Sequence, residues 1–227
     1  ANAWFGFGYD DIGKAPKTKK VVVVGGGPAG MEAARVASLR GHDVTLIEKA
    51  SRMGGLTPLA ALIKGLEIED LPSLVRWFSR QLRQQGVKIE LGKQADPESI
   101  RALKPDAVIL ATGGVLNSPP LDGANGRVVT TPELHRRVKP WLRLFGPRFL
   151  GWATHYWLPI GRSVVVIGAG LHGMEVAEFL TKRGRVVTVL EPSERVGEGC
   201  IDFRLGLLMN WLERKGVKII TEAKSIK

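Results

Sequence analysis

An internal repeat limits the fold of this chain more than any other feature of its sequence. Residues 21–55 read VVVVGGGPAGMEAARVASLRGHDVTLIEKASRMGG, and residues 164–197 read VVVIGAGLHGMEVAEFLTKRGRVVTVLEPSERVG. An offset of 143 residues aligns the glycines, one glutamate and one arginine of the two copies: Gly25 with Gly168, Gly27 with Gly170, Gly30 with Gly173, Gly41 with Gly184, Glu48 with Glu191, and Arg52 with Arg195. We therefore expect both copies to build the same supersecondary unit.

Each copy has the pattern of a βαβ unit. A run of β-branched residues, 21–24 or 164–167, is typical of a strand that is buried on both faces of a parallel sheet. A glycine loop follows, then a helical stretch that a glycine closes as a C-cap, and then a second apolar strand. We expect the helices and the second strands at residues 29–39 and 171–183, and 44–47 and 186–190.

The alternation of helices and strands continues after each copy. The pattern predicts a helix, strand, helix and strand after the first copy, and a helix and strand after the second, at residues 71–85, 87–91, 98–103, 107–111, 203–215 and 217–220. This order predicts an α/β fold of two Rossmann-like, doubly wound parallel-sheet units. We expect the second unit to be incomplete, because a doubly wound half-sheet needs more strands.

The glycine loops, residues 25–30 and 168–173, have the spacing of a dinucleotide-binding fingerprint. The first glycine permits a tight turn, the second lets the backbone approach a pyrophosphate, and the third allows the helix to pack closely on the strand. The amides of the helix N-terminus then face the phosphates. Glu48 and Glu191 each lie 23 residues after the first glycine, close to the spacing of a ribose-binding carboxylate. Two complete fingerprints predict two adenine dinucleotides.

Three residues of the second copy bear on the choice of nucleotide. A carboxylate at Glu191 can accept hydrogen bonds from the adenosine ribose hydroxyls and would repel a 2′-phosphate, which predicts NADH rather than NADPH. We interpret Arg195 as a surface or pyrophosphate-side residue, because Arg52 holds the equivalent place in a copy where no 2′-phosphate is expected. His172 is either a solvent-facing loop residue or a phosphate contact.

The cysteine and histidine content excludes several kinds of site. Cys200 is the only cysteine, so this chain alone cannot carry a disulfide framework, a zinc knuckle, an iron–sulfur cluster or a CxxC redox pair. His42, His135 and His155 lack metal-ligand spacing, and no catalytic acid or base stands out. No stretch approaches about 18 consecutive apolar residues, and residues 1–20 lack the apolar run of a signal peptide. We therefore expect a cytoplasmic protein without a membrane span.

The segment 134–160 is both basic and aromatic. It contains five basic residues, six aromatic residues and no acid, in a chain whose formal net charge is +11. Such a segment could bind nucleic acid or a membrane surface. Because Pro140, Pro147 and Pro159 should break any long amphipathic helix, packing against a neighbouring domain is favoured, and we expect no nucleic-acid partner.

Together the motifs resemble a known family. The GGGPAG loop, the Glu48-Lys49 pair, the RMGG motif at 52–55 and the ATGG motif at 111–114 are similar to the FAD-binding half of two-dinucleotide flavoprotein reductases. Within that group the chain resembles, over about residues 20–227, the flavin and pyridine-nucleotide region of the 2,4-dienoyl-CoA reductase, 2-enoate reductase and trimethylamine dehydrogenase family, which is old yellow enzyme-like.

The resemblance implies an NADH-dependent flavoprotein oxidoreductase that passes hydride from NADH to a flavin. Its substrate would be an enoate or enoyl-CoA-type compound at a site outside this chain. By resemblance, residues 54–56 approach the flavin side of FAD, and residues 111–113 pass close to its pyrophosphate. The predicted cofactor contacts are Gly25, Gly26, Gly27, Pro28, Ala29, Gly30, Glu48, Lys49, Arg52, Gly54, Gly55, Leu56, Ala111, Thr112 and Gly113 for FAD, and Gly168, Gly170, Leu171, His172, Gly173, Glu191 and Arg195 for NADH.

Members of that family also have an FMN barrel, usually a cysteine-ligated iron–sulfur cluster, and a returning Gly-Asp strand that grips the flavin. We therefore expect a truncated or internal piece whose parent polypeptide, or a partner subunit, supplies the FMN barrel and the iron–sulfur region. Two alternatives stay open. One is a non-catalytic adenine-nucleotide-binding or interdomain module that holds ADP in place of FAD, and the other is a flavin monooxygenase.

These inferences divide the chain into four segments. We expect an arm or connector at residues 1–20, a FAD-type (or ADP) dinucleotide-binding unit at 21–115, a basic aromatic connector at 116–160, and an incomplete NAD-binding unit at 161–227.

Overall fold

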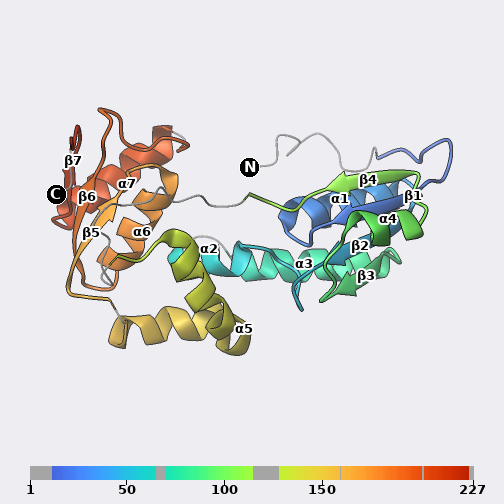
Figure 1. Cartoon of the computed structure of the whole chain (residues 1–227), viewed down its shortest axis with the longest axis horizontal. Coiled ribbons are helices and arrows are strands. Elements are labelled where there is room, and N and C mark those ends of the chain that lie inside the picture. The colour runs from blue at the N-terminus through green and yellow to red at the C-terminus, as the bar shows by residue number, and fades with distance from the viewer. Residues whose placement is uncertain (1–11, 65–69, 115–127, 159, 201, 225–227) are drawn as a thin grey trace. The chain divides into compact units, whose positions relative to one another are not determined.

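The computed structural model describes residues 12–64, 70–114, 128–158, 160–200 and 202–224. The chain forms two compact units (Figure 1). Unit 1 comprises Ala1–Pro58 and Asp70–Leu116, and unit 2 comprises Leu59–Glu69 and Asn117–Lys227. The chain therefore passes from one unit to the other three times.

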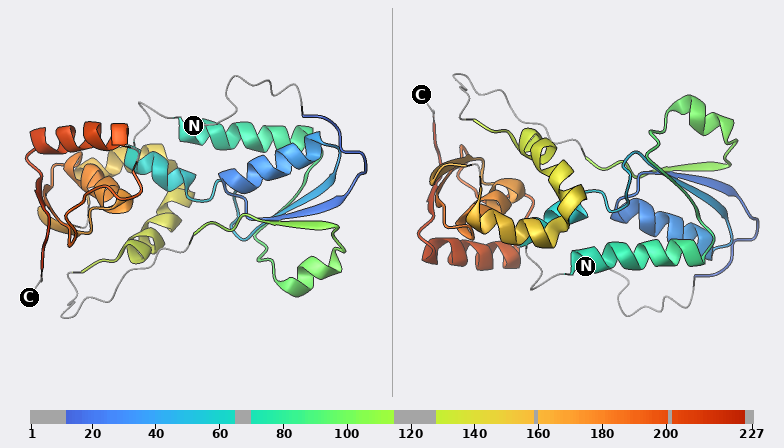
Figure 2. Two further views of the ribbon diagram at one scale, coloured as in Figure 1. Left: turned by 90° about the horizontal axis from the view of Figure 1, so that it is seen from above. Right: turned by 90° about the horizontal axis from the view of Figure 1, so that it is seen from below.

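Unit 1 is built on a four-stranded parallel sheet with the strand order β3-β2-β1-β4. Val23 of the central strand β1 pairs with Leu46 of β2 on one side and with Ile109 of β4 on the other. Figure 2 shows helices α1 and α3 side by side on one face of this sheet and α4 on the other side. The elements are β1 (Lys20–Val24), α1 (Pro28–Leu39), β2 (Asp43–Glu48), α3 (Leu71–Gln84), β3 (Lys88–Leu91), α4 (Pro97–Ala102) and β4 (Ala107–Leu110).

The core of unit 1 lies between the sheet and the helices α1 and α3. Val23 and Leu46 from the strands, Met31 from α1 and Leu82 from α3 are all fully buried. These positions follow the helical and strand periods of the sequence, so burial of this apolar face stabilises the unit. The alternating strand residues Val22 and Ile47 are also buried.

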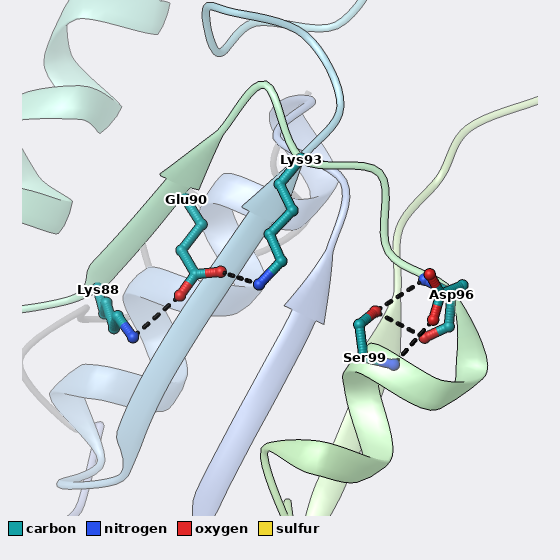
Figure 3. A network of polar contacts seen from close by, with 5 residues as sticks. All are labelled: Lys88, Glu90, Lys93, Asp96 and Ser99. Carbon is teal, nitrogen blue, oxygen red and sulfur yellow. Dashed lines mark hydrogen bonds and ion pairs between the residues drawn. The ribbon is translucent and has the colours of Figure 1, made fainter.

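Polar contacts form at the edge strand β3 and at the start of α4 (Figure 3). The carboxylate of Glu90 on β3 accepts from Lys88 Nζ at 2.9 Å and from Lys93 Nζ at 2.8 Å. The hydrogen bond from Lys93, followed by that from Lys88, lowers the pKa of Glu90. Asp96 and Ser99 form a capping box that starts α4, in which the Asp96 carboxylate accepts from the Ser99 amide at 2.8 Å.

Unit 2 is built on a three-stranded parallel sheet, β5-β6-β7, which repeats the first three strands of unit 1. One face packs on α6 and α7 through a core that includes Val166, Val189, Met174 and Leu212. The other face leaves apolar side chains exposed, with Val165 57% and Ile167 43% accessible. The elements are β5 (Ser163–Ile167), α6 (Leu171–Thr181), β6 (Val186–Leu190), α7 (Asp202–Arg214) and β7 (Lys218–Ile220).

The strand β5 lies at the edge of its sheet, whereas its counterpart β1 lies between two strands. Within the described residues, no strand of unit 2 occupies the place that β4 has in unit 1. The two-unit α/β fold predicted from the repeat is confirmed, and the second sheet has fewer strands than the first.

Two further helices pack together in unit 2. Leu59 and Leu62 of α2 (Thr57–Lys64) bury their side chains against Leu142 of α5 (Thr131–Tyr156). The buried Arg183 joins this packing, because its guanidinium donates to Thr154 Oγ1 at 2.8 Å and to the Leu62 carbonyl at 3.4 Å. Burial lowers the pKa of Arg183 to about 10.

The expectation that the prolines of segment 134–160 break any long helix is wrong for Pro140, which lies inside α5. The break comes at Gly146, whose φ of 77° and ψ of 167° join two helical parts of α5, seen as a bend in Figure 1. Glycine adopts this positive φ without steric cost, and Pro147 then starts the second helical part. Pro159 lies outside the described residues.

No helix within the described part of the chain is long and apolar enough to cross a membrane. Those residues also bring together no group of three or more histidine, cysteine, aspartate or glutamate side chains that could hold a metal ion.

Candidate functional site

The two glycine loops lie at the carboxyl ends of the strands in both sheets. In unit 1, the Gly25 amide donates to the Ile47 carbonyl of β2 at 2.8 Å, and the Ala111 amide after β4 donates to the Val24 carbonyl at 2.8 Å. In unit 2, the Gly168 amide donates to the Leu190 carbonyl of β6 at 2.8 Å. In both units the loop thus connects a first strand to a helix at the sheet edge where ligands of open α/β sheets bind.

Backbone angles and packing require glycine at some positions of the first loop but not at all of them. Gly25 has a φ of +110°, and a Cβ there would collide with the Ala111 carbonyl. A Cβ on Gly30 would collide with the carbonyl of Gly25. Gly27, in contrast, has a φ of −74° and a ψ of 177°, which any residue can adopt, and the nearest atom to an added Cβ is the Gly55 Cα at 4.0 Å. The protein itself therefore requires glycine at the first and third positions but not at the second.

The second loop repeats this division. Gly170 has a φ of −66° and a ψ of −179°, and the nearest atom to an added Cβ is the Glu198 carbonyl oxygen at 3.6 Å. A Cβ on Gly173 would collide with the Gly168 carbonyl. Gly168 has a φ of +95°, but nothing lies within 4 Å of its Cβ position, because β5 is an edge strand in the described part of unit 2.

The helices that follow the glycine loops begin without a side-chain cap. The N-terminal amides of α3, α4 and α5 are capped by the side chains of Asp70, Asp96 and Thr130. The N-caps of α1 and α6 are Gly27 and Gly170, which have no side chain to offer, and neither helix has an acid in its first turn. Their amides are thus arranged for an external anion rather than for an internal cap.

The predicted ribose carboxylates have matching surroundings. In unit 1, Glu48 is buried, and its two oxygens accept from the Gly26 amide at 2.6 Å and the Ala50 amide at 2.7 Å. In unit 2, Glu191 accepts from the Ala169 amide at 2.6 Å and from the Ser193 amide at 2.9 Å. These backbone hydrogen bonds, Ala169 first, lower the pKa of Glu191, so this group stays ionised. Each carboxylate is fixed beside its glycine loop and keeps lone pairs for ribose hydroxyls.

A second backbone contact fixes the loop after each carboxylate. The Gly54 amide donates to the Gly26 carbonyl at 2.8 Å, and the Gly197 amide donates to the Ala169 carbonyl at 2.7 Å. The backbone donors Ala50, Ala169, Ser193 and Gly197 are not among the site residues predicted from the sequence. The offset of 143 residues, applied to Gly54, leads directly to Gly197 and is the signal that could have found it.

The other predicted site residues lie around these loops. Pro28 and Ala29 occupy the first turn of α1, and Leu171 and His172 occupy that of α6. Ala111, Thr112 and Gly113 follow the end of β4. The exposed members of the predicted set are Pro28, Ala29, Lys49, Arg52, Gly55, Leu56, Thr112, Gly113, His172 and Arg195. The structure thus gathers the first set at the ends of β1, β2 and β4, and the second set at the ends of β5 and β6.

The residues present fit an adenine dinucleotide at both loops. Each loop has open room beside its second glycine, uncapped helix amides and a fixed carboxylate. The room beside the glycine and the helix amides suit a pyrophosphate, and the carboxylate suits a ribose.

Comparisons with known proteins identify the family of this chain. A family model described as pyridine nucleotide-disulphide oxidoreductase matches residues 19–226. Bilirubin reductase of Mediterraneibacter gnavus is 35% identical over 224 residues, which are 98% of this chain and 32% of that protein. NADH oxidase of Thermoanaerobacter brockii is 39% identical over 187 residues, which are 81% of this chain and 26% of that protein.

A solved structure of 2-naphthoyl-CoA reductase in complex with 2-naphthoyl-CoA is similar to 97% of this chain, with a TM-score of 0.75 and 31% identity. The similar region is 31% of that reductase chain. The chain thus spans about a third, or less, of the length of these relatives.

Proposed function

The chain belongs to the pyridine nucleotide-disulphide oxidoreductase family, and within it we propose that this chain is the FAD- and NADH-binding portion of a flavoprotein oxidoreductase. In such a portion NADH supplies a hydride and a flavin accepts it, so the cofactors provide the chemistry. The residues of this chain contribute binding, orientation and electrostatics.

The second glycine of each loop carries the proposal. Neither the backbone angles nor the packing of the protein requires glycine at Gly27 or Gly170. A ligand that must approach the backbone closely does require it, and a pyrophosphate at a helix N-terminus is such a ligand. The uncapped amides of α1 and α6 support the same interpretation.

The first site is proposed to hold FAD. The Gly25–Gly30 loop and the start of α1 bind the pyrophosphate, and Glu48 orients the adenosine ribose, since its carboxylate is held by the amides of Gly26 and Ala50. The backbone of residues 54–56 and 111–113, which borders this loop, is proposed to continue along the cofactor.

The second site is proposed to hold NADH. Glu191 is fixed by Ala169 and Ser193, and its ionised carboxylate can accept hydrogen bonds from the ribose hydroxyls. A 2′-phosphate about 4 Å from this carboxylate would cost on the order of 1 to 4 kcal/mol per pair of unit charges, or about 5- to 1000-fold in affinity.

The substrate site is proposed to lie outside this chain. The relatives are about three times longer, which supports an FMN barrel and an iron–sulfur region on the parent polypeptide or on a partner subunit. The substrate class proposed from the motif resemblance is an α,β-unsaturated acid or thioester. The similarity to a reductase that was solved with 2-naphthoyl-CoA supports this class.

Paired variants of the second glycines test the two cofactor sites. Gly27→Asp should abolish binding at the first site and leave NADH binding intact, and Gly170→Asp should do the reverse, because the added carboxylate fills and repels the pyrophosphate position. Aspartate is a favoured N-cap residue. The free energy of unfolding of each variant should therefore equal that of the wild type or exceed it by a few tenths of a kcal/mol. Gly25→Ala serves as the control that should lose stability, because its Cβ would collide with Ala111.

The readouts are calorimetric titration with NADH and the absorption spectrum of the purified chain after FAD is added and excess removed. A retained flavin spectrum in wild type that disappears in Gly27→Asp supports the proposal. A wild type that binds ADP but no FAD would instead support the nucleotide-binding module. Wild-type affinity in either aspartate variant would refute the phosphate contact.

The nucleotide preference is tested at Glu191. Wild type should bind NADH about 5- to 1000-fold more tightly than NADPH, and Glu191→Ser should narrow this ratio by removing the charge repulsion. Equal or tighter NADPH binding by wild type, or an unchanged ratio in the variant, would contradict the assignment.

A further inference from the structure

Helix α5 has apolar side chains on two different faces. On one face, Leu142 is buried, and Val138 and Leu150 pack with it against Leu59 and Leu62 of α2. The other face carries five aromatic side chains, which we call the aromatic ridge: Trp141, Phe145, Phe149, Trp152 and Tyr156. The inner face already accounts for the attachment of α5 to unit 2, so the ridge is not needed for that purpose.

The rings of the aromatic ridge form an unbroken chain of contacts. Successive ring centroids lie 5.9, 5.0, 5.8 and 5.1 Å apart from Trp141 to Tyr156. Within each helical part, the i, i+3 and i, i+4 spacings bring these side chains to one side. The contacts also continue across the bend at Gly146, where the rings of Phe145 and Phe149 lie 5.0 Å apart.

The aromatic ridge is nevertheless accessible to solvent. The exposed fractions are 57% for Trp141, 45% for Phe145, 46% for Phe149, 60% for Trp152 and 78% for Tyr156. Leu144 and Trp157 beside it are 73% and 74% exposed. A contiguous apolar stripe of this kind indicates an interaction surface rather than isolated exposed residues.

The charged side chains of residues 134–160 all have one sign. Residues 134–160 contain five basic side chains and no acid, and all five are exposed: Arg136, Arg137, Lys139, Arg143 and Arg148. Arg137 is paired with Glu133 at 2.6 Å. Arg148 lies three residues after Phe145 and four before Trp152, so it stands within the ridge. A partner of this surface must therefore combine an apolar layer with negative charge.

We propose that the aromatic ridge of α5 binds the surface of an anionic phospholipid bilayer, with the helix lying in the plane of the interface. Tryptophan and tyrosine prefer the level of the lipid headgroups, where an apolar ring body and a polar edge are both accommodated. Basic side chains on an amphipathic helix add attraction to anionic lipids. A second copy of the chain fits the ridge poorly, since it would bring two sets of five positive charges together.

The test uses the whole chain and lipid vesicles of known composition. The chain should float with vesicles that contain phosphatidylglycerol and phosphatidylcholine, and only weakly with phosphatidylcholine alone. Its tryptophan emission should shift to shorter wavelength on binding, because three of its six tryptophans, Trp141, Trp152 and Trp157, lie on or beside the ridge. High salt should weaken binding by screening the charges.

Two pairs of variants distinguish vesicle binding by the ridge from non-specific adsorption of the protein. Trp141→Ser with Trp152→Ser should reduce the vesicle affinity by about tenfold or more, since two half-exposed indoles no longer enter the interface. Trp77→Ser, which changes a 46% exposed tryptophan of α3, should retain wild-type affinity. Arg143→Gln with Arg148→Gln should lose the preference for anionic vesicles, whereas Arg80→Gln with Arg83→Gln on α3 should keep it. Circular dichroism and gel filtration check that each variant stays folded.

Several outcomes would overturn the proposal. These are no flotation with anionic vesicles, equal flotation with neutral ones, or equal losses in the ridge and α3 variants. A wild-type dimer that becomes monomeric when the ridge tryptophans are replaced would also overturn it, because a second copy would then cover the ridge. A full-length parent protein that does not float with the same anionic vesicles would overturn it too, because a neighbouring domain would then cover the ridge.

Discussion

At the scale of single residues, the two carboxylates that follow β2 and β6 show how a repeat preserves a geometry with different partners. The Gly26 amide that binds Glu48 is replaced by the Ala169 amide at Glu191, and the Ala50 amide by that of Ser193. The backbone contacts are the same in both copies, and in the second copy the Ser193 hydroxyl also donates to the Glu191 carboxylate at 2.9 Å.

This geometry predicts how NADH binding depends on pH. The amide hydrogen bonds lower the pKa of Glu191, so the folded protein keeps this carboxylate ionised below the usual glutamate value of about 4.3. The hydrogen bonds that it accepts therefore stabilise the fold above that value and are lost as the pH falls through the lower, folded pKa. We expect the NADH dissociation constant to be constant from about pH 5.5 to 8.

Isothermal titration across that range checks the prediction, with His172→Gln as the control. An affinity that falls with a midpoint above about pH 5 would contradict the role of Glu191. Weaker NADH binding by His172→Gln at every pH of that range would instead show a phosphate contact of His172, one of the two roles that the sequence left open.

At the scale of secondary-structure elements, the repeat allowed accurate prediction because each strand and helix has a strong period and a glycine boundary. The strand expected at 44–47 is Asp43–Glu48, and the helix expected at 171–183 is Leu171–Thr181. Differences of one or two residues arise where the last turn leaves helical hydrogen bonding, as at Arg183. The family resemblance drawn from the glycine motifs is also confirmed.

The sequence did not predict α2, and it misplaced the break in α5. Helix α2 has only eight residues, and its apolar side chains are buried by α5, which lies far away in the sequence. The break at Gly146 depends on a positive φ that only the folded chain reveals, whereas Pro140 is accommodated within the helix. In both cases contacts between residues far apart in the sequence decide where a helix forms or breaks, and local sequence patterns do not show them.

The inner face of α5 gives a matched prediction of stability. Leu142→Ala should lower the free energy of unfolding by about 2 to 3 kcal/mol, because Leu142 is buried between α2 and α5. Leu144→Ala, two residues away and 73% exposed, should change it by less than about 0.5 kcal/mol. Urea unfolding followed by circular dichroism measures both values, and similar losses in the two variants would show that α5 does not pack as described.

At the scale of the whole molecule, the described part of the second sheet leaves β5 at an edge and one sheet face exposed, while the chain carries a net charge of +11. An edge strand can pair with a strand of another chain, and β5 also has the exposed apolar side chains Val165 and Ile167. Mutual repulsion between positively charged molecules opposes that pairing.

Salt should therefore promote self-association of this chain. Raising the salt concentration shortens the screening length from about 10 Å at 0.1 M to about 3 Å at 1 M, so repulsion weakens while apolar contacts persist. Light scattering should increase with salt in wild type and less in Val165→Lys, which places a charge on the edge strand. Scattering that decreases with salt, or that increases equally in the variant, would argue against β5 as the site of self-association.

The three passages of the chain between the units have a consequence for proteolysis. A peptide bond broken between residues 116 and 128 would leave α2 on the N-terminal fragment, while its packing partners Leu142 and Arg183 would be on the C-terminal one. The packing of α2 against α5 and Arg183 would then keep the two fragments joined without a covalent link. A nicked molecule of this kind runs as one species in gel filtration and separates into two bands only when it is denatured.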